Sequence, residues 1–222
     1  MSFELTPRLC NVFTYPASKD ENLNERRLML RRQLENVVDK AWGEYKKKYT
    51  WRSSLSHPHK FNNFSVSSMR VNLGRSEKDG KVLKSFLGSE FKDVTSSPVR
   101  NIHIFARVDE EGLSCGVMIP AEAWWDFGKL TTELENGEDN ILQSIKEELP
   151  SGFVEAQHWL KREEIEQLDK KQWLCVLRSH KPGQSFFCIK VMNGFEPDAE
   201  DFFGFYIPKL DKLFHQLKFD SL

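Results

Sequence analysis

The segment NIHIFARVDEEGLSCGVMIP, residues 101–120, decides the fold class of this chain of 222 residues. Apolar side chains occupy every second position of residues 102–108, which is the period of a strand with one face on a core. Residues 113–120 are again strand-like, and the DEEG between the two runs ends in Gly112, a residue that suits a tight turn. The segment therefore predicts an antiparallel β-hairpin.

Amphipathic patterns predict helices on both sides of this hairpin. The first helix runs from about Asn22 to Tyr49, with Asn22 as N-cap, Glu25 at the capping-box position and an apolar stripe facing a core. Its basic residues, Arg27 among them, are expected on the outer surface. The other predicted elements are a strand at 64–73, two helices between 121 and 149, a short charged helix at 161–171, a hairpin of 173–180 with 185–192, and a final helix from about 202 to 217 that Gly204 and Pro208 interrupt or kink.

This order of elements lacks the strict βαβ alternation of a doubly wound sheet. It predicts an α+β fold, with a mainly antiparallel sheet and helices packed on one face. We expect residues 1–222 to form a single domain, with residues 1–60 as an N-terminal helical and basic-loop segment packed on it. The strand residues expected to be buried are Ile102, Ile104, Val117, Ile119, Leu174, Val176, Ile189 and Val191.

The composition is that of a globular protein. The chain is 39% hydrophobic and 29% charged, and no apolar run approaches the roughly 18 residues of a membrane-spanning helix. The N-terminus lacks the order of a secretory signal, so we expect a cytoplasmic protein with no membrane contact. The four cysteines lack the close spacing of zinc or redox sites, so we expect reduced, buried thiols, with Cys175 and Cys188 facing each other across the second hairpin.

Charge is distributed unevenly along the chain. Residues 1–100 carry 19 Lys or Arg against 11 Asp or Glu, a balance of plus 8, and residues 101–222 carry 13 against 22, a balance of minus 9. Such a split is typical of a basic surface for a polyanion, and equally of two halves of one domain that attract each other.

Basic residues concentrate in the first helix, in the loop after it and in residues 70–84, RVNLGRSEKDGKVLK. Lysine and arginine neutralise phosphates, and an aromatic such as Trp51 can stack on an exposed base. Arg75 and the three lysines up to Lys84 follow at three-residue steps, so a turn or short helix would gather them on one side, and we favour a phosphate-contacting loop over a solvated turn. The candidate nucleic-acid-binding residues are Lys46, Lys47, Lys48, Trp51, Arg52, Lys60, Arg70, Arg75, Lys78, Lys81 and Lys84.

Motifs of catalysis or metal binding are missing from the sequence. It contains no G-x-S-x-G, no G-x-x-x-x-G-K-[ST], no H-E-x-x-H and no G-x-G-x-x-G. His57 and His59 form an H-x-H pair without companion ligands, so we expect no metal and no cofactor. The acidic PDAED, residues 197–201, is better explained by Asp198 as the N-cap of the last helix.

One part of the chain resembles a known family. Residues 101–130 look like the central part of an uncharacterised bacterial domain family with a signature close to R-F-S-K-D-K-x-P-Y-K. The tail, a basic hairpin region followed by residues 197–217, is similar to the closing strand and helix of that family. In RSEKDGKVLK, residues 75–84, the family's Phe, Pro and Tyr are absent, and Gly80 with Lys81 departs from its D-K step. The positions that match the signature are Arg75, Lys78, Asp79 and Lys84. The resemblance spans about residues 60–220 and implies an α+β fold, but it implies no activity.

Three functions follow as hypotheses. The first is a non-catalytic nucleic-acid-binding or recognition module, such as the specificity part of a bacterial restriction or defence system. The second is a protein-interaction module that uses the acidic, aromatic half of the chain, and the third is a metal-dependent enzyme. The aromatic residues proposed for the second function are Trp124, Trp125, Phe202 and Phe203.

Overall fold

In the computed structural model, the described residues are 5–53, 66–88, 100–137, 140–156, 162–178 and 186–220. Within them seven strands form one sheet in the order β1-β2-β3-β4-β7-β5-β6, and neighbouring strands pair antiparallel throughout. The α+β prediction is therefore confirmed. The strands are β1 (Thr50–Ser53), β2 (Ser68–Gly74), β3 (His103–Asp109), β4 (Gly112–Ile119), β5 (Phe153–Ala156), β6 (Glu163–Glu164) and β7 (Phe187–Gly194).

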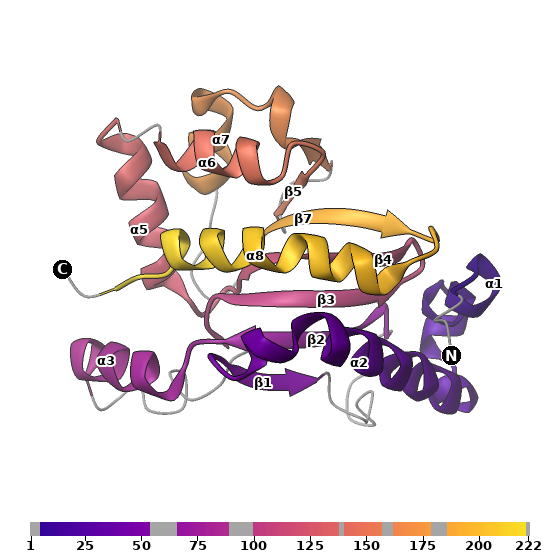
Figure 1. Cartoon of the computed structure of the whole chain (residues 1–222). Helices are drawn as coiled ribbons and strands as arrows, with labels where there is room; N and C mark the ends of the chain where they lie inside the picture. The colour runs from indigo at the N-terminus through magenta and orange to yellow at the C-terminus, as the bar shows by residue number, and fades with distance from the viewer. Residues whose placement is uncertain are drawn as a thin grey trace.

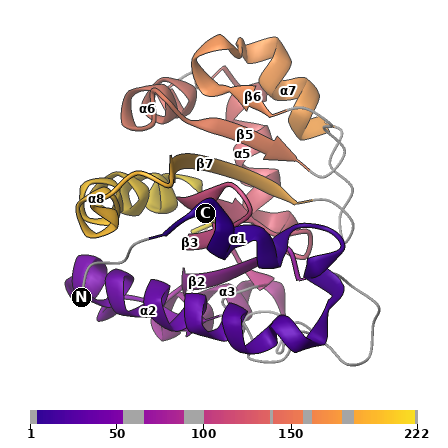
Figure 2. The same ribbon diagram turned by 90° about the vertical axis from the view of Figure 1, so that its right-hand side faces the viewer.

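Two long helices cover one face of this sheet, and the other helices lie at its edges and ends (Figure 1 and Figure 2). The α-helices are α1 (Pro7–Cys10), α2 (Asn24–Lys46), α3 (Glu77–Leu87), α5 (Trp124–Glu135), α6 (Asn140–Glu148), α7 (Lys170–Arg178) and α8 (Ala199–Leu217). Short 3-10 helices lie at Asn11–Phe13, Ala17–Lys19, Glu21–Leu23 and Ile165–Gln167. Figure 1 shows α2 and α8 side by side on the same face of the sheet, and Figure 2 shows this layer edge-on. No described helix is both long and apolar enough to cross a membrane.

The hairpin that decided the fold class is confirmed. β3 and β4 pair antiparallel from His103 opposite Met118 to Asp109 opposite Gly112. Gly112 has φ +99° and lies so close to the backbone of Gly194 in β7 that a Cβ atom would collide with it. Glycine is required here both by the turn and by the packing of the neighbouring strand.

The helix-covered face of the sheet carries the main hydrophobic core. The register aligns Leu73, Ile104, Val117, Ile189 and Val154 in one row across five strands, and all five are buried. The core continues without a break into α2, α5, α6, α7 and α8. Of the eight residues expected to be buried, seven are, while Leu174 is half-buried. This row confirms that the strands present an apolar face to the core.

One indole side chain joins helices α2 and α8. Trp42 of α2 is fully buried, packs edge-on against Phe203 of α8, and donates its Nε1–H to the Phe203 carbonyl at 3.0 Å. This bond joins residues 161 positions apart in the chain. The first and last long helices therefore close the core together, which fits their position in Figure 1.

The second predicted hairpin is wrong. Residues 170–178 form α7, and β7 pairs with β4 and β5 instead of with residues 173–180. In α7 the buried side chains are Trp173, Val176 and Leu177, at the three- and four-residue steps of a helix. The prediction that Cys175 and Cys188 face each other across this hairpin is therefore also wrong. Cys175 is exposed on α7, while Cys188 is buried in β7.

Smaller expectations also need correction. Residues 161–171 do not form one charged helix: β6 and a 3-10 helix lie in the described part of this stretch, and α7 begins only at Lys170. Residues 50–53, expected in a loop, form β1, because their backbone groups complete the edge of the sheet beside β2. Helix α8 passes through Gly204 and Pro208 as one helix.

The N-terminal end of the first helix also differs from the prediction. Helix α2 starts at Asn24 rather than Asn22, and its N-cap residue Leu23 makes no side-chain capping bond. Arg27, expected on the surface, is buried, and its guanidinium donates to the carbonyls of Val12 and Asp20 at 3.1 and 3.0 Å. Buried carbonyls need donors, so this arginine holds the N-terminal segment against α2.

Candidate nucleic-acid interface

Residues 70–84 divide between a strand and a helix, and they do not form a loop. β2 ends at Gly74, and α3 begins after Ser76, whose Oγ accepts the N–H of Asp79 at 3.1 Å. This is the capping geometry expected of serine at a helix start. The three lysines of the predicted site, at 78, 81 and 84, therefore lie on α3, and all three are exposed.

Helical geometry gathers these lysines on one stripe of α3. Steps of three residues advance by about 300°, so Lys78, Lys81 and Lys84 span about 120° of the helix circumference. The stripe lies opposite the buried Leu83, and Glu77 shares it. None of the three lysines makes an ion pair with a residue in the described ranges. The stripe is therefore positive and open to solvent.

Arg75 was expected to join this stripe, and that expectation is wrong. Its guanidinium forms a buried salt bridge with Asp126 of α5 and donates to the carbonyl oxygen of Phe219 at 2.9 Å. Only 5% of Arg75 is exposed. The residue precedes α3, so the three-residue spacing in sequence did not reveal that its side chain turns inward.

The end of α2 lies close to the beginning of α3. The register of the sheet pairs Thr50 with Gly74, so the residues before β1 and those after β2 lie at the same end of these strands. Lys47 and Lys48 precede β1 and are exposed. The sheet therefore brings together two basic stretches that are about thirty positions apart in the chain.

The lysines at the end of α2 contact carboxylates and aromatic rings nearby. Lys47 pairs with Glu44 at 2.6 Å, and the Lys48 ammonium lies 4.9 Å from the centre of the Tyr45 ring. Lys46 is half-buried, pairs with Asp39 and lies 3.6 Å above the Trp51 ring. Exposed ion pairs contribute little stability and exchange readily with other anions.

Trp51 is less available for nucleic-acid binding than the exposed lysines, and two further candidates have side chains outside the described part. Trp51 is half-buried against the core, so its structural role limits its use as a stacking platform. Arg52 pairs with Asn72 in the register of β1 and β2, and its side chain is outside the described part. Lys60 also lies outside the described residues, as do His57 and His59.

Arg70 belongs to a different surface, the sheet face opposite α2 and α8. It lies directly across from Arg107 of β3, and Arg107 lies across from Ser114 of β4. Like charges in facing positions repel, so the sheet holds them only with compensating acids. Arg107 pairs with Asp109 at 2.8 Å and lies 4.0 Å from Glu155 of β5.

Glu155 is the centre of this second charged cluster. Its Oε1 lies 2.5 Å from the ammonium of the fully buried Lys190 and 3.2 Å from Arg162. Burial lowers the pKa of Lys190, and Arg107 lowers it further. Burial alone would raise the pKa of Glu155, but Lys190 and its other cationic neighbours hold it below the ordinary value. The carboxylate therefore stays ionised and neutralises the cations around it.

Sequence reasoning missed this cluster, although a signal was present. Arg107 and Lys190 interrupt apolar runs at positions of the same parity as Phe105 and Cys188, which predicts that they share one face of their strands. Only one face of these strands was expected to lie on a core, and this second face is buried as well: His103, Phe105 and Lys190 are at most 2% exposed. The register across three strands, which places the cations together, is not visible in any one strand.

The residues proposed for protein interaction are mostly structural. Trp125 and Phe203 are buried in the core, and Phe202 is half-buried against it. Trp124 is 45% exposed and packs edge-on against Trp125. The sequence pattern alone did not separate these two neighbouring indoles, because α5 directs them to different sides.

Metal-binding geometry is not found in the part of the chain that the structure describes: no group of three or more His, Cys, Asp or Glu side chains there could hold an ion. Asp198 does occupy the N-cap position of α8, as predicted, but it has φ +66° and makes no side-chain capping bond.

Comparisons with known proteins do not identify a family for this chain. No family model matches the chain, and no curated protein matches it either. The resemblance to the uncharacterised bacterial family therefore stays a prediction, and the functional argument depends on the site itself.

Proposed function

We propose that this protein binds the phosphate backbone of nucleic acid through a basic surface made of Lys47, Lys48, Lys78, Lys81 and Lys84. The observation that carries the proposal is the stripe of three exposed lysines on α3, which make no ion pair within the described residues. Exposed lysines without an ion pair contribute little to stability, whereas several ammonium groups on one helix face attract a polyanion. The end of α2 extends this surface toward the first strand.

The experiment is a salt titration of binding to short random-sequence DNA, single-stranded and duplex, followed by fluorescence anisotropy. The wild-type affinity should fall steeply between about 50 and 200 mM salt, because each phosphate contact releases a counterion. Replacing Lys78, Lys81 and Lys84 together with alanine should weaken binding to all sequences alike. The slope of log affinity against log salt should decrease by up to about 3 units for duplex DNA.

A second triple variant controls for net charge. Lys40, Lys171 and Lys212 are exposed lysines on α2, α7 and α8, outside the basic surface, and replacing them with alanine removes the same charge. This variant should retain the wild-type slope. If the two triple variants lose affinity equally, or if the wild type shows no salt-dependent binding, the proposed function is wrong.

A further inference from the structure

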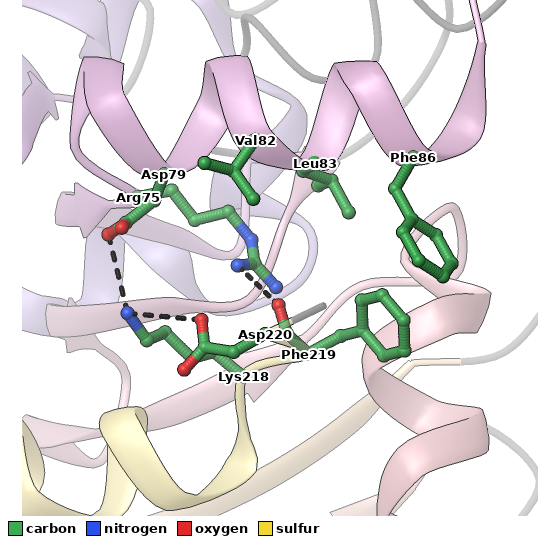
Figure 3. Close-up of a pocket in the computed structure, with 8 residues that line it drawn as sticks. All are labelled: Arg75, Asp79, Val82, Leu83, Phe86, Lys218, Phe219 and Asp220. Carbon is green, nitrogen blue, oxygen red and sulfur yellow. Dashed lines mark hydrogen bonds and ion pairs between the residues drawn. The ribbon is translucent and has the colours of Figure 1, made fainter. Parts of the chain in front are cut away.

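A small pocket lies between α3 and the chain segment that follows α8, as Figure 3 shows. Its volume is about 270 Å³, below the range of roughly 300–1,000 Å³ that is usual for drug-sized ligands. A single flat ring system is therefore a better match than a long molecule. The lining residues are Arg75, Asp79, Val82, Leu83, Phe86, Lys218, Phe219 and Asp220.

One wall of the pocket is apolar and unusually exposed. Val82 and Phe86, one helical turn apart on α3, are 43% and 52% exposed. Phe86 meets Phe219 edge-on, with 5.2 Å between ring centres, and both rings line the pocket in Figure 3. An aromatic ring exposed to this extent offers a stacking surface for another flat ring.

The opposite edge of the pocket is polar, with one hydrogen-bond donor group between two acceptor groups. The ammonium of Lys218 lies between two carboxylates, 3.4 Å from Asp79 and 3.3 Å from Asp220. Lys218 is only 6% exposed, and these two contacts face two of the three N–H donors of its ammonium group. Burial alone would raise the pKa of Asp79, but Lys218, Ser76 and Arg75 lower it, so this carboxylate accepts hydrogen bonds as an anion.

We infer that this pocket takes one unstacked guanine base of a bound nucleic acid, an inference that rests on the proposed function. The flat ring would stack on Phe86, its N1–H and 2-amino group would donate to the Asp79 or Asp220 carboxylate, and its O6 would accept from Lys218. Lys78, at one edge of the lysine stripe, lies one helical turn before Val82 in the pocket wall, so a strand whose phosphates contact that edge of the stripe passes beside the pocket.

Guanine fits this set of polar groups better than the other bases do. It presents two adjacent N–H donors, which one carboxylate accepts in a bidentate, charge-assisted pair, beside a carbonyl oxygen for the ammonium. Adenine and cytosine offer one amino group to the carboxylate. Uracil and thymine offer one N–H between two carbonyl oxygens, one of which would face a carboxylate.

The first test measures binding of GMP, AMP, CMP and UMP to the full chain by equilibrium titration. Because all four carry the same phosphate, differences report on the base. GMP should bind about tenfold more tightly than UMP, the discrimination typical of one good bidentate pair. Equal affinities for the four nucleotides would overturn the inference.

Two phenylalanine variants locate the binding. Phe86→Ala should lower GMP affinity by about tenfold, since a stacked aromatic contributes that much per base. Phe205→Ala is the matched control, because Phe205 is 59% exposed on α8, away from the pocket, and it should leave GMP affinity unchanged. Circular dichroism of both variants should match the wild type. An unchanged affinity in folded Phe86→Ala would place the nucleotide elsewhere and refute the pocket.

Oligonucleotides separate this inference from the proposed function. An oligo-dT strand and the same strand with one central dG should both bind in a salt-dependent manner, and the dG strand should bind more tightly. Salt-dependent binding without a dG preference would refute the pocket and leave the basic surface in place. GMP binding without any oligonucleotide binding would refute the basic surface and show a nucleotide pocket alone.

Discussion

Arg75 and Asp126, which are 51 positions apart in the chain, form a salt bridge that is almost completely buried. Asp126 also accepts the backbone N–H groups of Phe219 at 2.6 Å and Ile102 at 3.3 Å. The pair thus joins the start of α3, the start of α5 and the segment after α8 at one point. This junction supports both the pocket and the helix that carries the lysine stripe.

Asp126→Asn should destabilise the protein strongly. The variant leaves the Arg75 guanidinium buried without its counter-charge, and breaking a buried pair in this way costs about 3–5 kcal/mol. Urea unfolding followed by circular dichroism measures the loss. Glu122→Gln, an exposed acid just before α5, should change the free energy of unfolding by less than about 0.5 kcal/mol. Equal stability of the two variants would show that the buried pair is dispensable.

His103 should make stability depend on pH. Burial lowers its pKa from the ordinary 6.5 to about 4, and its Nδ1–H donates to the Asn101 carbonyl at 2.8 Å, so the native imidazole is neutral. Between these two values the unfolded chain binds a proton that the native chain does not. Stability is therefore fully present above about pH 6.5 and falls toward pH 4, by about 3 kcal/mol for this group.

The measurement compares urea unfolding of the wild type and His103→Gln from pH 7 to pH 4. The difference between their free energies of unfolding should shrink as the pH falls, because the variant has no imidazole to protonate. His215→Gln, at an exposed position of α8, should retain the wild-type pH dependence. A parallel decline in wild type and His103→Gln would contradict the buried neutral imidazole.

Two glycines should respond to alanine in opposite directions. A Cβ on Gly116 of β4 would collide with the backbone carbonyl of Ile189 in β7, so Gly116→Ala should destabilise the sheet by at least about 2 kcal/mol. Gly204 of α8 has open space around its Cβ position, so Gly204→Ala should stabilise the helix by about 0.5–1 kcal/mol. Thermal unfolding of both variants tests the pair, and a gain in stability for Gly116→Ala would refute the close approach of the strands.

One thiol should react much faster than the others. Cys175 is exposed on α7, whereas Cys10, Cys115 and Cys188 are buried. Burial raises the pKa of Cys10 and Cys188 to about 12 and about 11, which reduces their thiolate fraction further. A thiol-specific chromogenic reagent should modify one cysteine per native chain and four in urea, and Cys175→Ser should abolish the fast reaction. No fast thiol, or more than one, would contradict this pattern of exposure.

Local periodicity determined the parts of this fold that were predicted from sequence. The alternation in residues 102–108 and the turn before Gly112 required no partner to be recognised, and the hairpin formed where expected. The long amphipathic stripes of α2 and α8 were visible for the same reason. Shorter apolar runs carry too few residues to separate a period of 2 from one of 3.6, which explains why α7 was mistaken for a strand.

Tertiary structure alone decided which charges reach the solvent. Lys78 and Arg75 are three residues apart in the same basic stretch, yet Lys78 is exposed while Arg75 is buried on an acid from another helix. Likewise, Arg70, Arg107 and Lys190 come together only through strand register. Sequence spacing determines the face of an element on which a side chain lies. What covers that face depends on contacts between residues far apart in the chain, because burial is a property of the packed layers and not of one segment.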